Sequence, residues 1–258
     1  QYVAKDLFEA GGVPVVMKEL RKAGLMHEDC MTVTGYSMGE ELDKIDREAD
    51  GKVIYSVATP LSETGGVVGL IGNLAPDGAI VKVAGMTLPG RLNGKDVTVQ
   101  DVFEAVGEHQ AGNLSDEALR TLERVACPSA GACGGQFTAN TMACVSEAIV
   151  LALPNSWGAP APYESRYHYG MASGQAVMNL LEKNIRARDI VTLKSLQNAA
   201  RIVACTGGST NAGLHLPAIA HEAGIDFNLQ DVCDIFRDTP YFVDLKPGGQ
   251  YVAKDLFE

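Results

Sequence analysis

The first nine residues of the chain, QYVAKDLFE at 1–9, return unchanged as its last nine, at 250–258. A repeat protein would repeat a whole structural unit of roughly 20–50 residues several times, and nothing between the two copies repeats. The two identical segments would therefore compete for the same position in the folded structure. We expect only one copy to pack natively, whereas the other frays or exchanges with another molecule.

Composition excludes several classes of function. A net charge of −11 without a lysine or arginine cluster argues against a nucleic-acid partner. No apolar run approaches the roughly 18–20 residues that a bilayer span needs, and the N-terminus has no signal-peptide pattern. Six widely spaced cysteines are typical of a reduced protein rather than of a disulfide framework. We therefore expect a cytoplasmic protein without membrane contact.

Periodicity and capping residues predict a chain that is mostly helical. Ser115 and Asn228 are expected to cap helices, and Gly224 to end one. Short β-branched runs between turn residues predict strands, three of them in a block rich in Gly, Pro and Asn. The expected helices are 12–24, 98–109, 116–125, 135–153, 164–183, 192–204, 211–223, 229–238 and one from 250; the expected strands are 30–35, 52–57, 65–72, 78–85 and 241–245.

The first stretch that could carry chemistry is ACPSAGACGGQFTAN, at 126–140. Cys133 lies in a glycine-rich loop directly before an apolar helix, whose N-terminus favours a thiolate able to bind a metal ion. A small buried cysteine at a tight turn is an equally good interpretation from the residues alone. The spacing to Cys127 is not that of a standard zinc or ferredoxin motif. Any metal site at Cys133 must recruit distant ligands.

The second stretch, ACTGGSTNAGLHLPAIAHEAG at 204–224, places Ser209, Thr210 and Asn211 at the start of a predicted helix. Their hydroxyl and amide groups, with the free backbone N–H groups, suit a carboxylate or a phosphate. The same three residue types are also preferred helix caps without any ligand. His215, between two leucines, is expected to be a buried, hydrogen-bonded residue.

These two stretches, together with DLKPGGQYVAKDL and PLSETGGVVGLIGNLAPDGAIVKVAGM, resemble the dihydroxy-acid dehydratase family, which is related to sugar-acid and phosphogluconate dehydratases. The resemblance covers nearly the whole chain. It implies a homodimeric hydro-lyase that converts a 2,3-dihydroxy acid to a 2-keto acid in branched-chain amino-acid synthesis. It also implies an iron–sulfur cluster, 2Fe-2S by type, and Mg²⁺. Cys133 matches one cysteine ligand of the cluster, and residues 209–211 match a stretch near the substrate.

The order of the segments departs from the family pattern. In the family, the segment like that at Thr87 comes first among those present here, runs to Gly249, continues as Gln1 and reaches Met86. The family's N-terminal part is missing. Residue i is also identical to residue i+249 wherever both exist. We therefore interpret the chain as a closed, circular sequence of 249 residues that is read through once and then continues into its first nine residues again. The other cluster cysteines, the CDK motif, the Mg²⁺-binding glutamate and the serine base are missing. We expect little or no turnover from this chain alone, and we assign it no catalytic residue.

The expected fold is α/β. It comprises a helix-rich body, like the dehydratase N-terminal domain, from residues 87–249 and 1–45. A small partial β block at 46–86 would be the start of the C-terminal β-rich domain, and 250–258 duplicates 1–9. Two other functions remain open. One is a fragment of a sugar-acid dehydratase, and the other is a folded domain without catalytic activity.

Overall fold

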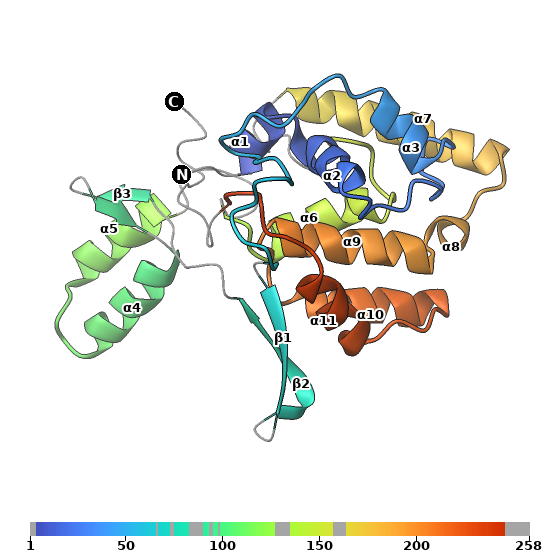
Figure 1. The fold of residues 1–258 in the computed structure, drawn as a ribbon. Helices are drawn as coiled ribbons and strands as arrows, with labels where there is room; N and C mark the ends of the chain where they lie inside the picture. The colour runs from blue at the N-terminus through green and yellow to red at the C-terminus, as the bar shows by residue number, and fades with distance from the viewer. Residues whose placement is uncertain are drawn as a thin grey trace.

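The computed structural model describes residues 4–65, 67–72, 75–82, 90–92, 95–97, 99–126, 135–156 and 164–245. Within these ranges the fold is dominated by helices, and the strands occur as two antiparallel pairs (Figure 1). The helices are α1 (Ala4–Glu9), α2 (Gly12–Lys22), α3 (Met38–Asp43), α4 (Val99–Gln110), α5 (Asp116–Ala126), α6 (Thr138–Ala148), α7 (Ser165–Glu182), α8 (Ala187–Ile190), α9 (Leu193–Cys205), α10 (Ala212–Ala223) and α11 (Leu229–Arg237). The strands are β1 (Val67–Gly72), β2 (Ala75–Lys82), β3 (Gly90–Leu92) and β4 (Lys95–Val97).

Helix α9 lies at the centre of the main body, between α6 and the pair α10 and α11 (Figure 1). From Ser195 on, its apolar and small residues are buried, among them Leu196, Ala199 and Ile202 at 0% exposure. The N-terminus of α9 is fixed by Thr192, whose hydroxyl accepts a hydrogen bond from the backbone N–H of Ser195. Small residues on α9 let neighbouring helices approach closely, so α9 forms the core on which the two motif stretches are built.

Several sequence-based predictions of local structure are confirmed. Asn228 accepts hydrogen bonds from the backbone N–H groups of Gln230 and Asp231 at the start of α11. Ser115 accepts one from the N–H of Ala118 at the start of α5. Gly224 ends α10 with φ 73, a left-handed conformation that glycine adopts without steric cost. These predictions hold because a cap depends only on residues within one turn of the helix end.

The predicted helix 135–153 is too long, because α6 covers only Thr138–Ala148. Val150 follows it with φ 68, which is unusual for a β-branched residue. The N–H of Leu151 then donates to Ser146 and that of Val150 to Glu147, the hydrogen-bond pattern of a Schellman cap. The Val150 carbonyl in turn accepts the N–H of Val33. A contact with a distant segment therefore ends this helix where no glycine marks the end.

The expected β block at 46–86 is not confirmed as a sheet. Strands β1 and β2 form an antiparallel hairpin at the predicted place, but residues 52–57 contain only an isolated bridge from Ile54 to Val243. The predicted strand 241–245 is likewise reduced to such bridges, and 30–35 is a turn with one bridge, Met31 to Ser37. Hairpin β3–β4 is not among the strands expected from the sequence. Val53, Ile54 and residues 241–245 are buried, but within the described residues they are joined only by isolated bridges.

The structure describes residues 4–9 of the first copy of the repeated segment and none of the second copy. In the first copy, α1 covers Ala4–Glu9 and its Leu7 is fully buried in the main hydrophobic core. The second copy, with the helix predicted from residue 250, lies outside the described residues. That only one copy packs natively therefore stays a prediction, as do the domain boundaries. No helix in the described part of the chain is both long and apolar enough to cross a membrane.

Candidate functional site

The Gly-Gly-Ser-Thr-Asn stretch forms the turn between α9 and α10. Gly207 adopts φ 60, which lets the chain reverse directly after α9. The Ser209 hydroxyl then accepts the backbone N–H of Asn211 at 3.2 Å, and the Ser209 carbonyl accepts the N–H of Ala212 at 3.1 Å. Ser209 therefore fixes the turn that leads into α10, whereas Asn211 at the N-cap position makes no side-chain cap hydrogen bond.

The other stretch enters α6 through a polar, mostly buried turn. Asn140, only 8% exposed, donates from its side-chain amide to the Gly135 carbonyl at 2.7 Å. Gln136, 2% exposed, donates to the sulfur of Cys144 at 3.1 Å. These hydrogen bonds hold the segment 135–137, which directly follows the glycine-rich loop, against the first turns of α6.

The structure brings these two stretches into direct contact. The backbone N–H of Ser209 donates to the Thr141 hydroxyl at 2.9 Å, and the Ser209 hydroxyl lies 3.4 Å from that of Thr138. The side-chain amide of Asn211 also donates to the Thr138 hydroxyl. A Cβ atom added at Gly208 would lie 2.9 Å from the Thr141 methyl carbon. A glycine is thus needed here so that the turn can pack against α6.

Solvent reaches one side of this contact. Ser209 and Thr210 are half-buried and Asn211 is exposed, whereas Thr141 below them is fully buried. Hydroxyl, amide and backbone N–H groups thus gather where α6 and α10 both begin. Helix N-termini carry a partial positive charge, so this arrangement is chemically suited to the oxygen atoms of an anionic ligand.

Cys133 and Cys127 lie outside the described residues, so the structure does not test the predicted cluster ligand. The remaining cysteines, Cys30, Cys144, Cys205 and Cys233, are buried and unpaired with one another. Loss of hydration on burial raises the pKa of each of these four thiols above its ordinary value. Protonated thiols are poor metal ligands. As expected from the sequence, these four are core residues.

No group of three or more His, Cys, Asp and Glu residues within the described ranges is arranged to hold a metal ion. The part of the chain that the structure describes therefore does not fit a cluster or a magnesium ion by itself. His215, predicted to be buried, is instead exposed on α10. The flanking leucines misled this prediction, since Leu216 is buried whereas Leu214 is 72% exposed.

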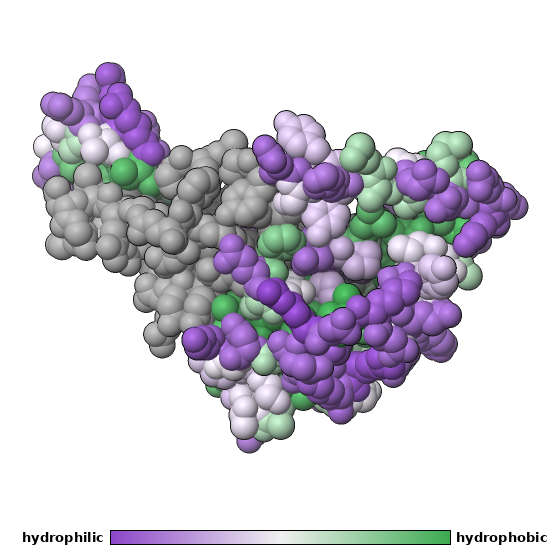
Figure 2. Space-filling model, turned by 90° about the horizontal axis from the view of Figure 1, so that it is seen from above, coloured by the Kyte–Doolittle hydropathy of each residue, from purple (hydrophilic) through white to green (hydrophobic). Residues whose placement is uncertain are grey.

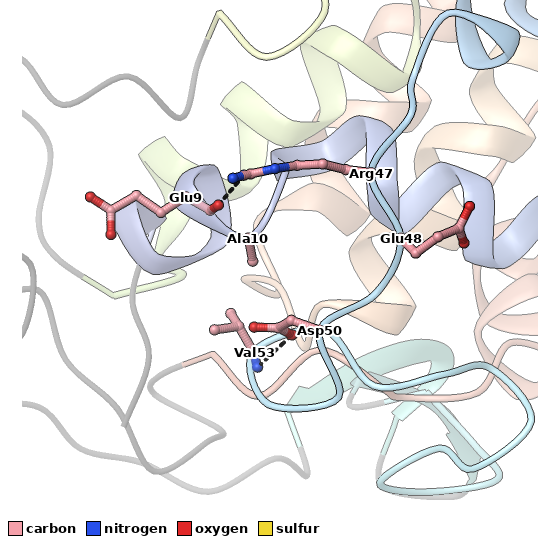
Figure 3. A pocket seen from close by; sticks show the side chains of 6 residues that line it. All are labelled: Glu9, Ala10, Arg47, Glu48, Asp50 and Val53. Carbon is pink, nitrogen blue, oxygen red and sulfur yellow. Dashed lines mark hydrogen bonds between the residues drawn. The ribbon is translucent and has the colours of Figure 1, made fainter.

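A separate cavity of about 370 Å³ lies beside α1 and the segment that follows α3 (Figure 3). Its charged groups are engaged within the protein. The Arg47 guanidinium donates to the Glu9 carbonyl, and the Asp50 carboxylate accepts the N–H of Val53 at 3.0 Å. The Glu48 carboxylate pairs with Lys18. These contacts brace the irregular segment against α1, and the cavity shares no residue with the two motif stretches. Its lining residues are Glu9, Ala10, Arg47, Glu48, Asp50 and Val53.

Comparison with known proteins shows which proteins this chain is similar to. A family model described as dihydroxy-acid/6-phosphogluconate dehydratase N-terminal matches residues 1–41 and 62–258. A dihydroxy-acid dehydratase of Dinoroseobacter shibae is 85% identical over 174 residues, which are 67% of this chain and 30% of that protein. One of Parvibaculum lavamentivorans is 72% identical over 180 residues, covering 70% and 31%. One of Sulfurisphaera tokodaii is 47% identical over 178 residues, covering 69% and 32%. The match thus spans about a third of these relatives' length.

Proposed function

The chain belongs to the dihydroxy-acid/6-phosphogluconate dehydratase N-terminal family, and on that premise we propose that it is part of a dihydroxy-acid dehydratase. The complete enzyme is a hydro-lyase that removes water from a 2,3-dihydroxy acid and yields a 2-keto acid. The three relatives described above, all named dihydroxy-acid dehydratases, favour this substrate class over a sugar acid. We place the enzyme in the cytoplasm and expect it to act as a homodimer.

The observation that carries the proposal is the contact between the turn 207–211 and the start of α6. Two stretches about 70 residues apart in sequence meet through Thr138 and Thr141. Residues 135–137, which follow Cys133 closely in the sequence, lead into α6 beside this contact. We therefore propose that Cys133 faces the same site as Ser209, Thr210 and Asn211, and that these three residues bind the substrate through its oxygen atoms.

The proposed cofactors are an iron–sulfur cluster, with Cys133 as one ligand, and Mg²⁺. A single cysteine cannot hold a two-iron cluster, and the described residues add no further group of ligands. We therefore assign no step of the reaction to these cofactors in this chain. What the chain's own residues contribute is a fixed set of hydrogen-bonding groups, held in place by the contact with α6 before any substrate arrives.

A folded domain without activity is the second candidate for this chain taken alone. It is favoured by the four buried cysteines, whose raised thiol pKa leaves them protonated. Iron content separates the two possibilities. After anaerobic reconstitution with iron and sulfide, less than one iron per chain would support the inactive domain. Iron binding that is lost in Cys133→Ser, but kept in the control Cys233→Ser, would support a ligand at Cys133.

Activity is tested by a chimera in which residues 87–249 replace the matching segment of an intact relative. We expect the chimera to convert 2,3-dihydroxyisovalerate to its keto acid. Replacement of Ser209 or Asn211 by alanine should lower kcat/KM by roughly 10- to 100-fold, because a hydrogen bond to a charged group contributes about 1.5–3 kcal/mol. The control Ser173→Ala, on the exposed side of α7, should leave it unchanged.

The outcomes of the chimera experiment are distinct. A folded, iron-loaded chimera that acts on a sugar acid but not on 2,3-dihydroxyisovalerate would reassign the substrate class. A chimera that is active, yet insensitive to both alanine substitutions, would remove residues 209–211 from the proposed site and leave the family assignment intact.

A further inference from the structure

Asn211 occupies the N-cap position of α10, yet its side chain does not cap that helix. Asparagine is among the best N-cap residues because its side-chain oxygen accepts a backbone N–H group of the first helical turn. Here the side-chain nitrogen instead donates to the hydroxyl oxygen of Thr138, at the start of α6. A contact with a second helix has therefore replaced the cap hydrogen bond that the residue type favours.

Thr138 joins the starts of the two helices through its side chain. It is the first residue of α6 and is half-buried. In the described part of the chain its hydroxyl group contacts the turn 207–211 twice, through the Asn211 amide and, at 3.4 Å, through the Ser209 hydroxyl. The Ser209 hydroxyl oxygen in turn accepts the backbone N–H of Asn211 at 3.2 Å. The three residues thus form a closed ring of contacts, which restrains each of their side chains.

The ring of contacts decides which atom of the Asn211 amide remains available to a ligand. The amide nitrogen is occupied by Thr138, and Asn211 as a whole is exposed. Within the described residues, no hydrogen bond is made to the amide oxygen of Asn211. An amide oxygen accepts hydrogen bonds and cannot donate them. Asn211 therefore offers an acceptor, which suits the O–H of a hydroxyl group, whereas an ionised carboxylate has no hydrogen to donate to it.

We propose that Thr138 is a positioning residue that holds the Asn211 amide so that its oxygen accepts a hydrogen bond from a hydroxyl group of the substrate. This inference rests on the proposed function, because it concerns how the same turn selects a dihydroxy acid. A 2,3-dihydroxy acid has two hydroxyl groups that can donate, whereas its 2-keto acid product has none. A site built to bind a hydroxyl group discriminates against a molecule that lacks it. The positioned acceptor therefore favours the substrate over the product.

The orientation of the amide is tested by NMR on the full chain. The side-chain amide signals of Asn211 are identified by their loss in Asn211→Asp. We expect these signals to show a hydrogen-bonding shift that Thr138→Val removes and Thr138→Ser keeps, because serine retains the hydroxyl group. The control Ser173→Ala lies in α7, on the upper side of Figure 1, where hydrophilic and hydrophobic groups mix on the surface (Figure 2). It should leave the signals unchanged. Signals that Thr138→Val does not move would overturn the proposal.

The role of Thr138 in substrate selection is tested in the chimera described above. Thr138→Val should lower kcat/KM for 2,3-dihydroxyisovalerate by roughly 3- to 10-fold, through a higher KM at nearly unchanged kcat, because one neutral hydrogen bond to the substrate is weakened. Inhibition by the keto acid product should stay within about twofold of that of the unmodified chimera, since the product has no hydroxyl group for Asn211 to accept. Thr138→Ser should restore the unmodified KM.

A double-mutant cycle separates positioning from a merely structural role. In Asn211→Ala the amide that Thr138 holds is absent, so adding Thr138→Val should lower kcat/KM by no more than about twofold further. Equal losses in both backgrounds, or an equally large loss of product inhibition, would overturn the proposal. A chimera without any activity would count against the proposed function, and the NMR signals of the full chain would then decide the role of Thr138 independently.

Discussion

Replacement of Thr141 by valine tests the contact that joins the two motif stretches. Thr141 lies in α6 at 0% exposure, and its hydroxyl oxygen accepts the backbone N–H of Ser209 at 2.9 Å. Valine has nearly the same shape but no hydroxyl group. The packing against Gly208 is therefore kept, whereas the Ser209 N–H loses its acceptor inside the protein.

The structure sets the size of the effect. A donor left without a partner in a mostly buried place costs about 1–3 kcal/mol. The second hydrogen bond of Thr141, to the Gln136 carbonyl, is 3.4 Å long and adds little. For a chain of this length, a loss of 1 kcal/mol lowers Tm by roughly 2–4 °C. We therefore expect Thr141→Val to lower the free energy of unfolding by about 1–3 kcal/mol and Tm by roughly 2–12 °C.

The assay is urea and thermal unfolding followed by circular dichroism. The matched control is Thr121→Val, since the Thr121 hydroxyl donates to the Glu117 carbonyl on the exposed surface of α5. The control should change the free energy of unfolding by less than about 0.5 kcal/mol. If Thr141→Val also stays within that range, with an unchanged denaturant slope, the hydrogen bond to Ser209 does not hold the two stretches together.

Four further substitutions test local features of the fold. Gly224→Ala should destabilise the chain by about 1–2 kcal/mol, because residue 224 has a left-handed φ. Gly107→Ala inside α4 should instead stabilise the chain by up to about 1 kcal/mol. No atom lies within 4 Å of a Cβ at either position, so thermal unfolding of the two variants reports the backbone effect alone. Asn228→Ala should cost about 1 kcal/mol through the lost cap of α11, and an unchanged Tm would contradict this. Hydrogen bonds from two α2 lysines lower the pKa of Glu48 to about 2 from an ordinary 4.5. Its stabilising effect is therefore present above pH 4.5 and lost as the pH falls towards 2, so Glu48→Gln should flatten that part of a pH titration of stability.

Local signals in the sequence predicted much of the helical structure. The caps at Ser115 and Asn228 and the glycine at 224 mark the ends of α5, α11 and α10. Each of these ends depends on hydrogen bonds within a few residues, so a single sequence contains the necessary information. The same is true of the β1–β2 hairpin, where short apolar runs flank turn residues.

Contacts between distant segments decided the rest. The α6 helix ends early because the Val150 carbonyl meets the N–H of Val33, more than 100 residues away in the chain. Val53, Ile54 and the run 241–245 are buried without forming regular strands, since only isolated bridges connect them. A sequence shows that such runs are apolar, but the presence of a pairing partner is a property of the whole fold.

The candidate site divides in the same way. The sequence by itself determined which residues could bind a ligand: Ser209, Thr210 and Asn211 have the necessary groups, and Cys133 has the residue type and position of a metal ligand. Only the tertiary structure decided that the turn 207–211 packs against Thr138 and Thr141. Likewise, periodicity predicted α7 but not which of its sides faces solvent. The packing of the turn and the orientation of α7 both depend on which surfaces meet when the helices pack. The hydrophobic effect acts on the apolar area of the whole chain rather than on any one segment.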